Sequence, residues 1–370
     1  MSRAPSRAQR GDFGGNTDSR RPLSEHFAKK AKSDLAMAQA MAKLSTPGRS
    51  LALGESGLVL GTCMYLAQQS LEKMLKSTVF RLYETLYGSY DDDGDTDDDM
   101  PRSLGHWIYP KTCRRYFALL DSLQATEILR GCKYTDILDN RMVTDTKHRE
   151  TSLDSLDKLW KEYAKNSKIQ NIAWRHSIGM RLEGNDLQTL EHRHKLLAGI
   201  LTNITCRPGL EITCFSLDRQ IPKISPKECL DVHALGRRRK EHSNSAPASG
   251  LSTALDREFS ECRVGVRDLA SSSVHGGSYT RTVQRAILEF GFVLLLYHFK
   301  PYTAMFPHNT MGRYPLLLDG VHTTTDLYGR QVEHVMHHLF IGVPHSVSQL
   351  SDYSGRISTL WDEISGYRAS

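Results

Sequence analysis

The chain has 370 residues, enough for one large domain or two ordinary ones. Its 39% hydrophobic and 24% charged residues suit a soluble globular protein with a sizeable core. The net charge of +6 permits a nucleic-acid partner without demanding one, and the seven scattered cysteines, with no C-x-x-C pair, argue against a disulfide framework and a structural zinc site.

Residues 1–21 are rich in Arg, Ser and Gly and poor in large apolar side chains, so we expect a disordered tail. An organelle transit peptide is the alternative, although Asp12 and Asp18 weaken it because such peptides contain few acidic residues. The segment has no apolar signal core. We therefore expect an intracellular, cytoplasmic protein, with organelle targeting left open.

Two helices should follow this tail. The first should begin after Pro22, with Ser24 as its cap, and end where Pro47 and Gly48 interrupt it. The second should span about residues 51–87, because its apolar residues recur at steps of three and four. These residues are Leu60, Met64, Leu71, Leu75, Val79 and Leu82.

The middle of the chain should be mostly helical. Residues 91–99 form a dense acidic run that should be a solvated loop, because it lacks the ligand spacing of a calcium-binding loop. A third helix should start at residue 103, and further helices should fill residues 126–220. Within that region residues 210–215 alternate like a short strand.

The last third of the chain has one linker-like stretch. Residues 236–253 combine a basic run with Ser, Asn, Ala, Pro and Gly, which is typical of a linker. One helix should cover residues 279–299 and a last one residues 325–340, followed by a C-terminal tail over 346–370. Strand signals are sparse throughout, so we predict an all-α protein.

Four segments, in this order along the chain, resemble the HEPN domain family, a small helical bundle in nucleotide- and RNA-associated proteins. They are Ala31-Lys32-Ser33-Asp34-Leu35-Ala36-Met37-Ala38, then the block from Ala67-Gln68-Gln69 through Glu72-Lys73 to Lys76, then Leu104-Gly105-His106, and finally Gly312-Arg313-Tyr314-Pro315. Two departures stand out. Trp107 replaces an acidic residue of the family pattern, and the acid expected directly after Pro315 is missing.

The resemblance implies an all-α, HEPN-like helical bundle enlarged by a mostly helical insertion. Residues 22–124 would carry its first three helices, residues 125–278 the insertion, and residues 279–345 the closing helices. Members of the family dimerise through the bundle, so a homo-oligomer is expected as well.

The family also suggests where function would lie. Lys73, His106 and Arg313 fall in the matching segments and would contact nucleotide or RNA phosphate, since an arginine guanidinium suits bidentate phosphate binding. An alternative for Arg313 is that it binds the C-terminus of a helix. The function predicted on this basis is a non-catalytic nucleotide- or RNA-binding module.

A second hypothesis is a metal-independent endoribonuclease, because many family members carry an Arg followed shortly by a His as catalytic groups. The pairs Arg330 with His337 and Arg237 with His242 fit that pattern best, the former because one helix would place both residues on one face. A third is a structural subunit bound to a protein partner. No cofactor is expected, and no apolar run reaches the roughly 18 residues that cross a membrane.

Overall fold

The computed structural model describes residues 22–45, 53–87, 108–114, 146–205, 221–271, 277–314, 316–317 and 322–366. These residues are mostly helical, and the β pairing among them is limited to an isolated bridge between Leu317 and Thr323. The predicted all-α class is therefore confirmed. The expected tail over 1–21, acidic loop over 91–99 and strand over 210–215 lie outside the described residues, as does His106.

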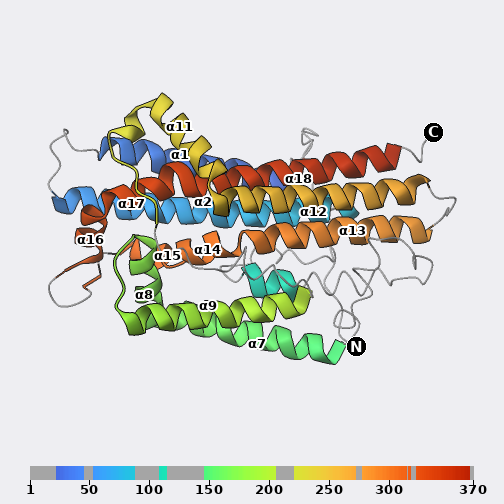
Figure 1. Cartoon of the computed structure of the whole chain (residues 1–370), viewed down its shortest axis with the longest axis horizontal. Coiled ribbons are helices and arrows are strands. Elements are labelled where there is room, and N and C mark those ends of the chain that lie inside the picture. The colour runs from blue at the N-terminus through green and yellow to red at the C-terminus, as the bar shows by residue number, and fades with distance from the viewer. Residues whose placement is uncertain are drawn as a thin grey trace, which may run out of the picture.

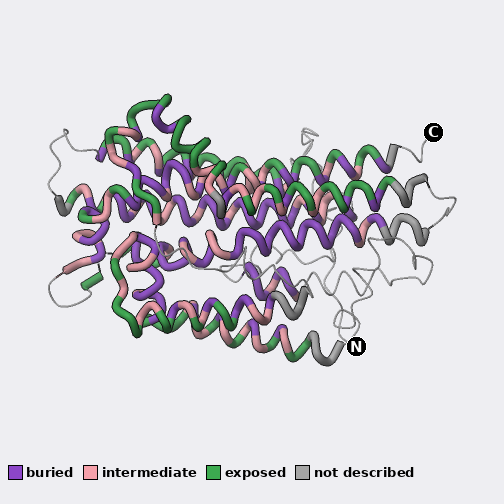
Figure 2. Tube along the Cα trace, in the orientation of Figure 1, coloured by how far each residue is buried: buried purple, intermediate pink, exposed green. Residues whose placement is uncertain are grey.

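Long helices running side by side form the main body of the protein (Figure 1). They are α1 (Leu23–Leu44), α2 (Leu53–Tyr87), α12 (Ala246–Ser271), α13 (Gly277–Tyr297) and α18 (Val343–Gly366). Helix α2 contacts most of the others, and its buried residues recur at helical spacing, as the sequence predicts. Figure 2 shows buried residues along α2 and along α13 from residue 283 onward, so the core follows these two helices.

A second layer lies below this body in Figure 1. It consists of α7 (Thr146–Lys165), α8 (Ser167–Ser177) and α9 (Gly184–Thr205). Trp160 of α7 stacks on Tyr302, with ring centroids 5.9 Å apart, and the Tyr163 hydroxyl donates to the Thr303 carbonyl at 2.8 Å. Tyr302 and Thr303 belong to a short helix that packs on α2, so burial of these large aromatic side chains attaches the layer to the main body.

Short helices connect and close the bundle. They are α11 (Val232–Asn244), α14 (Phe299–Met305), α15 (His308–Met311), α16 (Thr324–Arg330) and α17 (Val332–His337), with a 3-10 turn at Glu228–Leu230 and a π-helix at His338–Gly342. Residues 108–114 are also helical.

The predicted linker over residues 236–253 is wrong. Helices α11 and α12 cover it and meet at Ser245. The carboxylate of Asp231 caps α11 by accepting from the backbone N–H groups of His233 and Ala234. The proline of the stretch, Pro247, falls in the first turn of α12, where its missing N–H costs no helical hydrogen bond.

The C-terminal end also differs from the prediction. Residues 346–370 were expected to form a tail, but α18 continues to Gly366 and buries one face. The buried residues are Val347, Leu350, Tyr353, Ile357, Leu360 and Ile364, spaced three and four apart. The single helix expected over residues 325–340 is broken at Gln331 into α16 and α17.

Helix α1 begins where the sequence predicts, but the prediction that Ser24 caps it is wrong. The helix follows Pro22, whereas Ser24 lies inside the first turn and is fully buried. The Ser24 hydroxyl donates to Glu84 of α2, and the Ser24 backbone N–H donates to Oε1 of the same carboxylate at 2.9 Å. A tertiary partner on α2 therefore supplies what the sequence assigned to a local cap.

Helix α2 approaches α16 closely because of Gly57. A Cβ atom at Gly57 would lie 1.9 Å from the carbonyl oxygen of Thr325, closer than real atoms come. Gly57→Ala should lower the free energy of unfolding by about 1–3 kcal/mol, since the backbone must move to relieve the clash. The measurement is urea denaturation followed by circular dichroism.

The matched control is Gly236→Ala on α11, where an added Cβ meets no atom within 4 Å. That variant should be neutral or more stable by up to about 1 kcal/mol, because alanine restricts the unfolded chain. Equal stability changes in the two variants would contradict the close packing at Gly57.

Candidate functional site

Arg313 lies between two aromatic rings on the surface. Its guanidinium carbon is 5.2 Å from the ring centroid of Tyr65 on α2 and 5.3 Å from that of Tyr314. Arg313 is exposed, and 51% of Tyr314 is accessible to solvent. Among the residues that the structure describes, no carboxylate forms an ion pair with Arg313. We name these three residues the Arg313 platform.

The backbone beside the platform is held close to α2. Gly312 ends α15, and a Cβ atom there would lie 2.5 Å from the carbonyl oxygen of Gly61. This approach sets Arg313 beside Tyr65, one turn further along α2. The alternative suggested by the sequence, that Arg313 binds a helix C-terminus, has no support among the contacts of the described residues, where its side chain contacts rings instead.

Lys73 has a structural partner. Its ammonium group forms an ion pair with Asp34 of α1, and about a quarter of the Lys73 side chain is exposed. In the next turn, the Ser70 hydroxyl donates to the carbonyl oxygen of Ala31 at 2.7 Å. The first two segments that resemble the HEPN pattern therefore pack on each other, and Lys73 helps to join them.

The remaining polar residues of the α2 segment form a buried ladder. Gln69 Nε2 donates to Gln68 Oε1 at 2.7 Å, and Gln68 Nε2 donates to Glu72 Oε2 at 3.0 Å. Lys76 Nζ donates to Glu72 Oε1 at 2.9 Å. Gln68 and Glu72 are at most 2% exposed, so these two side chains are inaccessible to a ligand, whereas Gln69 is half-buried.

The Arg330 and His337 pair does not share a continuous helix. Arg330 is exposed at the end of α16, whereas His337 is 7% exposed at the end of α17. The break at Gln331 lies between them, with φ −110° and ψ 33°, so the seven-residue step expected to align them is lost. This geometric premise of the catalytic hypothesis is wrong.

The Arg237 and His242 pair lies on a helix, α11, but the two side chains have different surroundings. Arg237 is exposed, whereas His242 contacts His337 and His345, with ring centroids 5.5 Å and 5.2 Å apart. The structure thus joins one histidine from each predicted pair and leaves both arginines at the surface.

The histidines around His242 are partly or largely buried and come from α11, α17, the π-helix and α18. We define the histidine cluster as His242, His337, His338 and His345. Burial lowers the pKa of His337 to about 3, with His338, His242, His334 and Arg238 adding repulsion. Burial also lowers the pKa of His338 and of His345 to about 4. The π-helix that follows α17 is a kind of element often found at functional sites.

Three histidines of the cluster are unsuited to act as a general acid at neutral pH. A general acid must hold a proton near neutral pH, whereas these depressed pKa values keep His337, His338 and His345 neutral there. Arg238 of α11 is bonded to Glu228 and Glu241, and Arg239 Nε donates to the Phe340 carbonyl at 3.2 Å. In the described part of the chain, no group of three or more His, Cys, Asp or Glu could hold a metal ion.

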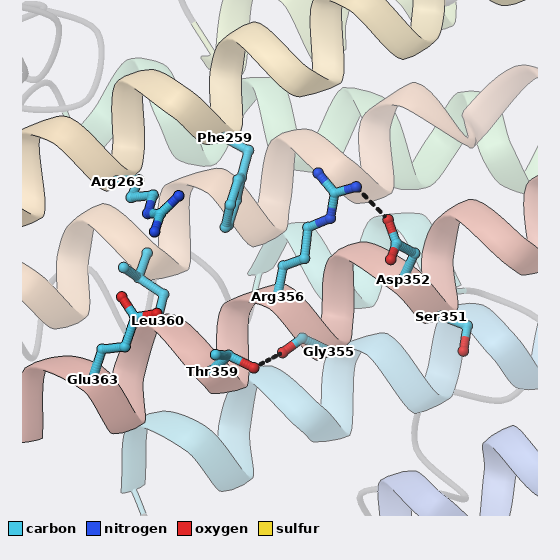
Figure 3. Close-up of a pocket in the computed structure, with 9 residues that line it drawn as sticks. All are labelled: Phe259, Arg263, Ser351, Asp352, Gly355, Arg356, Thr359, Leu360 and Glu363. Atoms are coloured by element: carbon cyan, nitrogen blue, oxygen red, sulfur yellow. Dashed lines mark hydrogen bonds and ion pairs between the residues drawn. The ribbon is translucent and has the colours of Figure 1, made fainter.

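A groove of about 530 Å³ lies between α12 and α18 (Figure 3). Phe259 and Arg263 of α12 and Arg356 of α18 line it, together with the acidic residues Asp352 and Glu363. Arg356 bonds Asp352 at 2.9 Å, so two positive and two negative side chains balance each other in this groove. It therefore shows no preference for an anion.

Sequence reasoning missed His345, which belongs to no Arg–His pair and joins the cluster only through the packing of α18 on α11. The sequence also predicts Arg313 and Lys73 as ligand-binding residues. In the structure Arg313 is exposed, whereas Lys73 forms an ion pair with Asp34. Sequence reasoning could not anticipate Tyr65 as a platform residue, because the contact joins residues far apart in the chain.

Comparisons with known proteins found no match among family models, curated proteins or solved structures. In the described part of the chain, no helix is both long and apolar enough to span a bilayer.

Proposed function

We propose that the protein is a HEPN-like, non-catalytic module that binds RNA or a nucleotide through the Arg313 platform and acts as a homodimer. The observation that carries the proposal is the exposed guanidinium of Arg313 between the rings of Tyr65 and Tyr314, with no carboxylate partner among the described residues. A guanidinium binds phosphate, and tyrosine rings stack on bases of any sequence.

The packing of the motif segments supports the HEPN-like part of the proposal. Asp34 and Ala31 of the first segment contact Lys73 and Ser70 of the second, and Arg313 of the last segment contacts Tyr65 just before the second. Three segments that resemble one family pattern therefore lie together along α2, as one shared bundle would require.

Arg313→Ala should weaken binding of a fluorescently labelled single-stranded RNA by about 10- to 100-fold, because a charge-assisted phosphate contact contributes about 1.5–3 kcal/mol. Tyr314→Ala should weaken it by about tenfold through lost stacking. Fluorescence anisotropy over a series of salt concentrations measures both effects. Loss of one phosphate contact should lower the salt dependence by about one ion in Arg313→Ala and leave it unchanged in Tyr314→Ala.

Arg257→Ala is the matched control. Arg257 is an exposed arginine on α12, 4.0 Å from Glu261, and its removal changes the net charge equally. Wild-type affinity in Arg313→Ala, or an equal loss in Arg257→Ala, would contradict the site. Gel analysis of the same RNA without metal detects any ribonuclease activity, and sedimentation of the wild type tests the homodimer.

A further inference from the structure

A second groove, of about 840 Å³, lies where α1, α2 and α18 meet. Lys29 and Lys32 of α1 and Arg81 of α2 line it, while Ser351 of α18 closes its other side. We name it the basic groove. About 24 Å of helix separates Tyr65 from Arg81 along α2, so this groove is distinct from the Arg313 platform.

The charge in the basic groove is strongly one-sided. Lys29 and Lys32 stand three residues apart on one face of α1, where like charges repel. Both are exposed, and among the described residues neither lysine has an ion-pair partner. Glu25, whose carboxylate lies 3.8 Å from Arg81, is the acidic residue of the lining. Three cations against one carboxylate leave a surplus of two positive charges.

The other lining residues add a hydrogen-bond donor and an apolar surface to the basic groove. His26 adds a ring N–H donor, and Leu23 and Ala28 add an apolar surface beside the charges. The volume falls in the range of about 300–1,000 Å³ that is usual for small-molecule sites. A ligand with one negative charge would leave part of the surplus uncompensated, whereas linked phosphate groups carry enough negative charge to compensate all of it.

We propose that the basic groove binds a small ligand that carries two or more linked phosphate groups. Glu25 lies 3.8 Å from Arg81 and opposes the charge of the ligand, so it limits the affinity. The linked phosphates can belong to an inorganic polyphosphate or to a nucleoside triphosphate, whose base would lie against Leu23 and Ala28.

Isothermal titration of the full chain with inorganic tripolyphosphate tests the proposal. The double variant Lys29→Gln/Lys32→Gln should bind at least about tenfold more weakly than wild type, because it removes two charge-assisted contacts. Glu25→Gln should bind several-fold more tightly, since it removes the opposing charge. A merely nonspecific attraction of the basic protein for phosphate would not depend on these positions.

The matched control is Lys158→Gln/Lys195→Gln, which removes two exposed lysines from α7 and α9 and lowers the net charge equally. It should bind tripolyphosphate as wild type does. A parallel titration with a nucleoside triphosphate separates the two ligand sources, since tighter binding than tripolyphosphate indicates contacts to the nucleoside.

No binding by wild type, or an equal loss in the control variant, would overturn the proposal. Arg313→Ala should retain its affinity for tripolyphosphate, so failure of the basic groove and failure of the Arg313 platform are separate results.

Discussion

Lys76→Met should lower the free energy of unfolding by about 3–5 kcal/mol, the usual cost of removing one partner from a buried ion pair. Lys76 Nζ donates to Glu72 Oε1 at 2.9 Å, and the two side chains are only 11% and 3% exposed. Methionine fills similar space but removes the cation, so the Glu72 carboxylate loses this ion pair within the core. Urea denaturation at pH 7 measures the change.

Lys73→Met is the control for this prediction, because it makes the same substitution one turn away on α2. Lys73 and Asp34 are 25% and 21% exposed, and such partly solvated pairs contribute about 0–1 kcal/mol. The double variant Glu72→Leu/Lys76→Met should recover much of the stability lost in Lys76→Met, since both charges are then removed. Similar losses in Lys76→Met and Lys73→Met would show that burial does not set the energy of the pair.

Lowering the pH from 7 to 5 should destabilise the protein through the histidine cluster. In the folded state the pKa is about 3 for His337 and about 4 for His345, against an ordinary value of 6.5. The unfolded chain therefore binds protons first. Stability from these groups is fully present above about pH 6.5 and falls as the pH drops toward the folded pKa values, by about 1.4 kcal/mol per pH unit for each group.

Most groups that face the histidine cluster lower the pKa of its rings, as the loss of stability at low pH requires. Arg238 from α11, His334 from α17 and His242 all oppose protonation of His337. Lys223 lowers the pKa of His334, while Glu333 acts in the opposite direction but is half exposed. Among the described residues, most groups around the buried rings oppose protonation, so adding a proton to these rings is unfavourable.

Urea denaturation at pH 7 and pH 5 gives the free energy of unfolding at each pH, and the difference is the quantity compared between variants. His345→Gln should reduce that difference, because Nε2 of His345 is buried without a hydrogen-bond partner among the described residues. His233→Gln, at an exposed position of α11, should keep it. Equal pH dependence in both variants would contradict a role for the buried ring.

Helix boundaries were predicted well where the hydrophobic pattern is local. The sequence placed the second helix at about residues 51–87, and α2 spans Leu53–Tyr87, because its apolar repeat alone decides which face is buried. Composition gave a wrong prediction for residues 236–253. Their Ser, Gly and Pro residues indicate a linker, but the stretch is helical. Packing of α12 on α13 buries Leu255 and Cys262, and that burial overrides weak helix propensity.

Sequence spacing also failed to predict the contacts of the two proposed Arg–His pairs, for a related reason. Arg330 and His337 have a suitable separation in sequence, but the helix breaks between them. His242 and His337 are far apart in sequence, yet their rings are in contact. Helix α11 packs against the π-helix, which begins directly after His337. Sequence separation predicts contacts within one helix, and it carries no information on contacts between helices.

The sequence by itself determined the all-α class, the long helices α1 and α2, and the segments that resemble the HEPN pattern, because each depends on residues within a few helical turns. Only the tertiary structure decided what each charged side chain does. Lys76 is buried against Glu72, Lys73 joins α1 to α2, and Lys29 faces an open groove. These lysines look alike in the sequence, since burial and distant partners set the energy of a charge, and both arise only when the helices pack.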